Sequence, residues 1–237
     1  MNHPTESAIS ELFSLNDPEI CKKIAEISQY VLISNNQTFL TIGQRQSHML
    51  FLVNGIARFY YMDPDGREHT LCFCSTPGYP LMVHINTTGS LSGAHAVGSL
   101  LALTMPTDQI MAMVGAYPEL MGCYNRILNQ ALLYHAEIAV MLRGTTPQQR
   151  YQWLCYRMPE VAKKARKRHI ASFLGITPET LSRLRAKKDA APQTMPVMYH
   201  TAQARDSDAL WDQVQKPQFS PAPSNRPMNG GTSHVGS

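Results

Sequence analysis

The sequence lacks the long apolar run that a membrane protein needs. Its 237 residues contain no stretch of about 18 or more consecutive apolar residues, whereas a transmembrane helix takes about 20. The opening residues, MNHPTESAIS, have neither the basic head nor the apolar stretch of a secretory signal. We therefore expect a cytoplasmic protein with no membrane partner.

Cysteine is scarce and irregularly spaced. The chain has an odd number, five, whereas disulfide scaffolds carry an even, patterned set, so we expect reduced thiols. They are Cys21, Cys72, Cys74, Cys123 and Cys155. Cys72 and Cys74 are two apart on an expected strand, so their side chains face the same way. Two small buried residues are the simplest explanation, and a redox pair or part of a metal site is the alternative.

The residues also lack a metal-binding pattern. Barrel-shaped metalloenzymes of the cupin type use an H-x-H pair with a nearby Glu and a later His. Here His48, His69, His84 and His95 are isolated, and carboxylates beside them are sparse. We expect no metal site, no identifiable cofactor and no enzymatic activity.

Positive charge is absent from the middle of the chain and concentrated near its end. No Lys or Arg occurs between Arg67 and Arg126. Residues 143–188 hold 12 Lys/Arg against 2 Asp/Glu, a net charge of +10, whereas the remaining residues hold 9 against 15, a net charge of −6. A basic module on an acidic body is typical of a nucleic-acid-binding protein.

The basic segment contains a predicted helix-turn-helix at residues 166–188, RKRHIASFLGITPETLSRLRAKK. Gly175 suits the end of a first helix, because glycine adopts a positive φ at low cost. Thr177 suits the N-cap of a second helix, and Pro178 its first position. A helix, a short glycine-containing turn and a second helix are the layout of a DNA-recognition motif.

The second helix exposes side chains that match base edges in the major groove. Arg183 can pair with guanine, Glu179 can accept from cytosine, and Ser182 can bond to either kind of edge. Other residues of the motif are expected to meet phosphates and so to position the protein without selecting a sequence. They are Arg168, His169, Thr177, Thr180, Arg185, Lys187 and Lys188.

Residues from about 30 to 106 predict many short strands. The runs YVLIS, TFLTI, HMLFLV, IARFYYM and HTLCFC are β-branched and aromatic, and turn residues such as Asn54-Gly55 separate them. This pattern is typical of a sandwich or barrel. A short helical segment broken at Asp17-Pro18 precedes the strands, so the fold class is α+β.

A long helix is predicted from about Pro118 to Leu142, with two apolar stripes. The first stripe follows alternating steps of four and three, as in a coiled-coil seam, and suggests a homodimer. It consists of Leu120, Tyr124, Ile127, Ala131, Tyr134, Ile138 and Met141. The second stripe is expected to pack on the strands of the same chain. It consists of Met121, Leu128, Leu132, His135, Ala139 and Leu142.

The sequence resembles the Crp/Fnr family of bacterial transcription regulators in two places. IASFLGITPETLSRLR matches the family's helix-turn-helix, and its run Glu179-Thr180-Leu181-Ser182-Arg183 resembles the base-contacting E-T-x-S-R of the Fnr branch. HMLFLVNGIARFYYMDPDGREHTLCF resembles the β-roll sensor domain, a jelly-roll-type fold. The resemblance covers about residues 13–188. It implies base contacts from Glu179, Ser182 and Arg183, and a parallel helix pair that joins sensor to DNA-binding domain.

The resemblance divides the chain into functional parts. Residues 1–108 are expected to form the sensor β-roll with its N-terminal helix, 109–143 the dimerisation helix and 144–188 the DNA-binding domain. Residues 189–237, rich in Pro, Ser, Gly and Asn, are expected to be a disordered tail. The implied partners are a palindromic operator in double-stranded DNA, a second copy of the chain, RNA polymerase and an unidentified small-molecule effector.

The sensor departs from the cyclic-nucleotide-binding pattern. That pattern needs a Gly-Glu pair and an Arg for the cyclic phosphate, and the corresponding region, STPGYPLMVHINTTGSLSGAHAVGSLLAL, has neither. A buried phosphate without a cation is costly, so we expect an uncharged or apolar effector, or none. Candidate pocket residues are Tyr79, Met82, His84, Tyr124 and Leu128. The alternative function is a ligand-binding or protein-interaction module of the same fold that has lost DNA binding.

Overall fold

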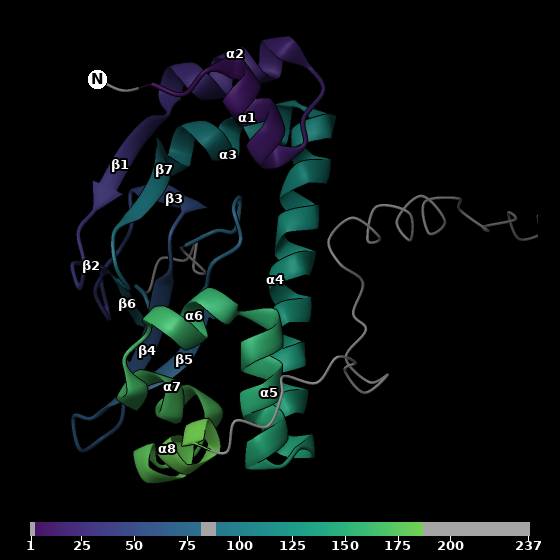
Figure 1. Ribbon diagram of the computed structural model, residues 1–237. Coiled ribbons are helices and arrows are strands. Elements are labelled where there is room, and N and C mark those ends of the chain that lie inside the picture. Colours follow the sequence, from purple (N-terminus) through teal and green to yellow (C-terminus); the bar gives the residue numbers. More distant parts are fainter. Residues whose placement is uncertain (1–2, 82–88, 187–237) are drawn as a thin grey trace, which may run out of the picture. The chain divides into compact units, whose positions relative to one another are not determined.

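The structure, a computed structural model, describes residues 3–81 and 89–186 (Figure 1). These residues form an α+β fold, as the sequence predicts. The strands are β1 (Gln29–Ile33), β2 (Thr38–Leu40), β3 (His48–Asn54), β4 (Ala57–Met62), β5 (Glu68–Cys74), β6 (Gly93–Ala96) and β7 (Leu100–Pro106). The helices are α1 (Glu6–Phe13), α2 (Pro18–Ile27), α3 (Thr107–Ala116), α4 (Pro118–Gly144), α5 (Pro147–Arg157), α6 (Pro159–Lys164), α7 (Lys167–Leu174) and α8 (Pro178–Ala186).

The strands form two antiparallel sheets with non-sequential strand orders. One sheet has the order β1-β7-β3 and the other β2-β6-β4-β5, so β5 is an edge strand. Strands β1 to β5 coincide with the predicted runs. β6 and β7 lie within the region expected to be strand-rich, but neither coincides with one of the predicted runs. β6 is Gly-Ala-His-Ala, which has no β-branched residue to mark it.

The turn between β3 and β4 requires a glycine. Gly55 has a φ of 109°, and a Cβ at this position would lie 2.8 Å from the Cα of Leu100. Both the backbone conformation and the close approach of the β7 strand therefore exclude a side chain. The predicted Asn54-Gly55 turn is therefore confirmed, and the positive φ and the nearby Leu100 backbone explain why it needs glycine.

The N-terminal helices are broken where the sequence predicts. The Asp17 carboxylate accepts hydrogen bonds from the backbone N–H groups of Glu19 and Ile20, and Pro18 opens α2. Side chains of α1 and α2 pack with those of β3, β7, α3 and the first half of α4 in one apolar cluster. Figure 1 shows these helices together at one end of the strands.

Helix α4 begins at Pro118, as predicted, but several residues of its two apolar stripes are buried or exposed in the reverse of the expected way. In the first stripe Leu120, Ile138 and Met141 are buried within this chain. In the second stripe Met121, Leu128 and Leu132 are exposed. The expectation that the first stripe is the dimer seam and the second packs on the strands is therefore wrong. Both stripes have helical spacing, which does not specify the partner of each.

Helix α5 has Thr146 as its N-cap, in a capping box with Gln149. Helix α6, between it and the predicted helix-turn-helix, was not anticipated. The interval 109–143 holds most of α3 and nearly all of α4, and the division into functional domains stays a prediction. Among residues 3–81 and 89–186, no helix is long and apolar enough to cross a membrane. The expected tail lies outside the described residues.

A buried carboxylate joins α4 to α5. Glu137 on α4 accepts a hydrogen bond of 2.9 Å from the indole N–H of Trp153 and one of 3.2 Å from the Arg157 guanidinium. Both Glu137 and Trp153 are buried. A buried donor that loses its acceptor carries its full desolvation cost, so this contact fixes how α5 packs on α4.

We expect Glu137→Ala to lower the free energy of unfolding by about 1–3 kcal/mol, because it leaves the Trp153 N–H without an acceptor. Glu137→Gln is the matched control, since its amide oxygen can still accept from the indole. Urea unfolding followed by Trp fluorescence measures both. Equal midpoints for the two variants would show that the hydrogen bond contributes nothing.

Candidate nucleic-acid interface

The turn between α7 and α8 has the geometry that the sequence predicts. Gly175 ends α7 with a φ of 61° in the left-handed region. The backbone N–H of Ile176 bonds to the carbonyl of Ala171, which closes the helix end. The Thr177 hydroxyl accepts from the backbone N–H of Thr180 at 3.2 Å, so Thr177 caps α8. Thus the predicted helix, turn and second helix are all present.

The apolar sides of the two helices hold α8 in place. Ile170, Phe173 and Leu174 of α7 and Leu181 of α8 are buried in the same core cluster. Leu184 is only half-buried. The opposite side of α8 is left facing outward, which is the side that carries the predicted base-contacting residues.

Two of these three residues are exposed. The side chains of Glu179 and Arg183 are exposed, whereas Ser182 is half-buried. The Ser182 hydroxyl donates to the carbonyl of Pro178 at 2.7 Å and accepts from the Lys167 ammonium at 3.0 Å. It would have to exchange one of these bonds to reach a base. The three lie on one turn of α8, and their contacts with DNA remain a prediction.

The Glu179 carboxylate is held in its charged form. Its own backbone N–H at the start of α8 and the Thr177 hydroxyl lower its pKa, and the nearby Arg183 and Lys167 charges act in the same direction. An ionised carboxylate only accepts hydrogen bonds. It therefore suits a base edge that presents a donor, such as the cytosine amino group.

The predicted phosphate contacts fall into three groups. Thr177 is exposed and Thr180 half-buried beside it, at the N-terminus of α8 where anions bind well. Arg185 is engaged elsewhere, because it donates to the carbonyl of Ala162 at 3.0 Å and so ties α8 to α6. Lys187 and Lys188 lie outside the described residues.

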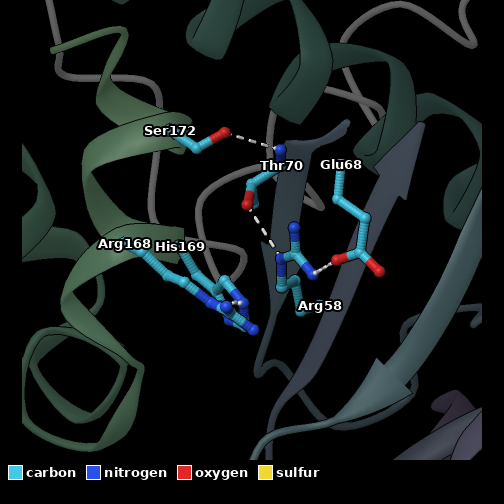
Figure 2. Close-up of polar contacts among 6 residues, drawn as sticks. All are labelled: Arg58, Glu68, Thr70, Arg168, His169 and Ser172. Atoms are coloured by element: carbon cyan, nitrogen blue, oxygen red, sulfur yellow. Dashed lines mark hydrogen bonds and ion pairs between the residues drawn. The ribbon is translucent and has the colours of Figure 1, made fainter. Parts of the chain in front are cut away.

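In the third group, Arg168 is exposed and donates to the His169 ring, and His169 faces the β-strands (Figure 2). His169 is 5% exposed, and its ring lies 5.5 Å from that of His95 on β6. The expectation that His169 contacts phosphate is therefore wrong for this arrangement of the chain. The basic neighbours Lys167 and Arg168 suggested that His169 contacts DNA, but α7 places the His169 side chain against the sheet.

The three candidate pocket residues that the structure describes, Tyr79, Tyr124 and Leu128, do not come together. Tyr79 packs edge-to-face on Tyr134 of α4 at 5.9 Å. Tyr124 lines a small apolar cavity of about 30 Å³, which is room for about one water molecule. Leu128 is 46% exposed. Met82 and His84 lie outside the described residues. The described members do not define one pocket.

The space between β5 and α4 is filled by the protein's own side chains. Cys72 and Cys74 are buried there, and the Tyr134 hydroxyl donates to the carbonyl of Phe73 on the same strand. Burial raises the pKa of the Cys72 thiol to about 12 and that of Cys74 as well. Buried protonated thiols are poor nucleophiles and metal ligands, which agrees with a packing role. Among residues 3–81 and 89–186, no group of three metal-binding side chains occurs.

Sequence reasoning missed one unusual residue of the four-stranded sheet, Arg58 on β4. Its side chain is 1% exposed. It donates to the Thr70 hydroxyl at 2.8 Å and to the Glu68 carboxylate at 2.7 Å, and both partners are on β5 (Figure 2). An arginine within an aromatic strand run was the available signal, but its two partners become visible only once the strands are paired.

The fold is found in solved structures of bacterial regulators. No protein-family model and no curated protein matches the chain. FixK2 from Bradyrhizobium japonicum aligns with a TM-score of 0.59 at 18% identity, over 68% of this chain and 84% of its own. A protein from Eubacterium rectale described as a transcriptional regulator of the Crp/Fnr family gives a TM-score of 0.60 at 14% identity, over 76% and 87%.

A third match comes from a regulator with a named effector. The c-di-GMP-responsive global regulator CLP of Xanthomonas campestris gives a TM-score of 0.56 at 12% identity, over 72% of this chain and 91% of its own. At these identities the similarity concerns the fold. The expected architecture is confirmed: the chain has the fold of Crp/Fnr-type regulators.

Proposed function

We propose that this protein is a sequence-specific DNA-binding transcription regulator. The observation that carries the proposal is the helix-turn-helix of α7 and α8, whose second helix exposes Glu179 and Arg183 within a segment of net charge +10. Base-specific hydrogen bonds from such a helix select a sequence, while the surrounding cations supply affinity through phosphates. The Crp/Fnr-type fold supports the same function.

The active form is a homodimer, and an exposed stripe of α4 supports this. We define the exposed stripe as Met121, Leu128, Leu132, Leu133 and Val140, which are 40–67% exposed. Met121, Leu128 and Leu132 follow one another at steps of seven and four, and Leu133 and Val140, seven apart, lie on the neighbouring side of the helix. Apolar side chains at such spacing are typical of a helix–helix interface. A dimer would cover this surface and bring two recognition helices to a palindromic operator, one DNA turn or about 34 Å apart.

The effector is not a cyclic nucleotide. A cyclic phosphate needs a cation inside the sensor. The sequence has no Lys or Arg between Arg67 and Arg126. Within residues 3–81 and 89–186, Arg58 is the one buried cation, and it is already paired with Glu68. The effector, of uncharged or apolar chemistry, would shift the dimer helices between two arrangements, of which one fits the operator and RNA polymerase.

The proposal is tested by selecting bound duplexes from a random DNA pool with the purified full chain at physiological salt. We expect a twofold-symmetric motif, because an isologous dimer places two identical recognition helices on the DNA. Cell extract is added in a parallel selection as a source of effector. Absence of enrichment in both selections would overturn the regulator and favour an interaction module without DNA binding.

Arg183→Ala should weaken binding to the selected site by about 1–3 kcal/mol and relax the preference at one base pair in each half-site. Arg45→Ala is the matched control, because it removes the same charge from an exposed residue of the loop between β2 and β3. Titrations against specific and random duplexes measure both variants. If Arg183→Ala weakened both duplexes equally, Arg183 would be a phosphate contact and not a base contact.

Leu132→Glu should raise the dimer dissociation constant at least tenfold, because it places like charges in the proposed interface, and it should weaken operator binding in parallel. Leu132 is 67% exposed, so the change does not disturb the core of the chain. Leu32→Glu, at a similarly exposed position on β1 (69%), is the control. Analytical ultracentrifugation of the two variants checks this. Identical dissociation constants would exclude the exposed stripe as the interface.

A further inference from the structure

Helix α7 docks on the outer side of the four-stranded sheet. Phe173 of α7 packs edge-to-face on Phe73 of β5, with ring centroids 5.4 Å apart. The backbone N–H of Thr70 donates to the Ser172 hydroxyl at 2.9 Å (Figure 2). β5 is the edge strand, so this bond satisfies a backbone group that no further strand pairs. The first helix of the DNA-binding motif is thus attached directly to the sensor.

The docked surface contains a buried cation. The Arg58 guanidinium is bonded to Thr70 and Glu68 and lies 5.0 Å from the Tyr60 ring. Burial alone would raise the pKa of Glu68, but the Arg58 hydrogen bond and charge hold that pKa below its usual range. One carboxylate therefore balances Arg58, whose side chain is buried, whereas the Glu68 side chain stays 41% exposed.

The geometry fixes His169 as neutral. The Nε of Arg168 donates to the Nε2 of His169 at 3.2 Å. Arginine remains protonated and only donates, so Nε2 of His169 must be the acceptor and carries no proton. Protonation would place two donors against each other and break this contact. His95 on β6, 5.5 Å from His169 between ring centroids, shares the same surroundings.

The junction already carries an excess of positive charge. The charged and titratable groups around His95 and His169 come from strands β4, β5 and β6 and from helix α7 with its N-cap. They are Arg58 and Tyr60 on β4, Glu68 on β5, His95 on β6, and His169 and Arg168 on α7 with Arg166 at its N-cap. The charges of three guanidinium groups, a buried one on Arg58 and exposed ones on Arg166 and Arg168, lower the pKa values of the two histidines, so each added proton increases like-charge repulsion.

We propose that the Arg58–His95–His169 junction is an acid-sensitive latch that holds helix α7 on the sensor and releases it when the histidines are protonated. The latch is the docked arrangement, in which His169 is neutral and covered. Release exposes His169 and frees Arg168 and the helix-turn-helix from the sheet. No effector is needed for the transition, because protons alone favour the released form.

The direction of the pH dependence follows from linkage. Burial, and then the charges of Arg58 and Arg168, lower the pKa of His169 to about 4 from an ordinary value of 6.5. The released state therefore binds protons more readily, so docking is strongest above pH 6.5 and is lost as the pH falls toward 4. Between pH 7.5 and pH 5 the docking equilibrium should fall roughly thirtyfold for His169 alone. His95, whose pKa burial also lowers, acts in the same direction.

Any effect of α7 release on DNA binding rests on the proposed function, but the release itself can be measured without DNA. Hydrogen exchange of the full chain, followed by mass spectrometry, compares wild type with His169→Phe at pH 7.5 and pH 5. Phe keeps a ring of similar size and cannot be protonated. Both proteins are compared at the same pH, so the chemical exchange rate cancels.

We expect equal exchange at pH 7.5. At pH 5, residues 68–74 and 167–174 should exchange at least tenfold faster in wild type than in His169→Phe. Strands β1 and β7 serve as the internal reference and should exchange alike in both proteins. His48→Gln, an exposed histidine on β3, should behave as wild type, and Ser172→Ala should speed exchange of residues 68–74 at both pH values.

Two results would overturn the latch. One is equal exchange of residues 68–74 in wild type and His169→Phe at pH 5. The other is simultaneous loss of protection in β1 and β7, which would indicate global acid unfolding. A histidine NMR titration of unmodified protein gives a second test that needs no variant. A His169 ring that titrates near 6.5 would mean that docking does not depend on its charge. A value below 6 supports the latch.

Discussion

The packing of α4 against its own chain is the constraint on which the rest of the structure depends. Its first half contributes Leu120 and Cys123 to the cluster formed with α1, α2 and α3. Its second half contributes Ile138 and Met141 to the cluster shared by the strands and the helix-turn-helix. A rigid helix that is buried at both ends transmits a displacement of one cluster to the other, because packed cores do not deform continuously.

Local chemistry made much of the fold predictable. Gly55 and Gly175 stand where the chain needs a positive φ, and Thr177-Pro178 is a helix start signal of the kind that Asp17-Pro18 and Thr146-Pro147 also give. These signals depend only on a residue and its neighbours. The strand runs from β1 to β5 are similarly local, because β-branched and aromatic side chains mark them without reference to their partners.

The sequence did not predict which surfaces of the chain pack against each other, because these partners are distant in sequence. Both stripes of α4 have the same spacing, so periodicity predicts two buried sides without assigning them. His169 lies among basic residues, yet its neighbours in space, Arg58 and His95, are distant in sequence and come from two strands. Arg58 is buried only because Glu68 and Thr70 face it across a strand pair, and this pairing requires the sheet register.

Helices α7 and α8 differ in how far the rest of the chain holds and covers them. Glu179 and Arg183 on α8 are exposed in the described chain, so these two proposed base-contacting side chains are already accessible. α7, by contrast, is fixed to the sheet by an apolar contact, a backbone hydrogen bond and a neutral histidine. Uncovering α8 would therefore change the proposed DNA affinity little. Control of DNA binding can act by changing where α7 is held, since α8 follows α7 through their shared core.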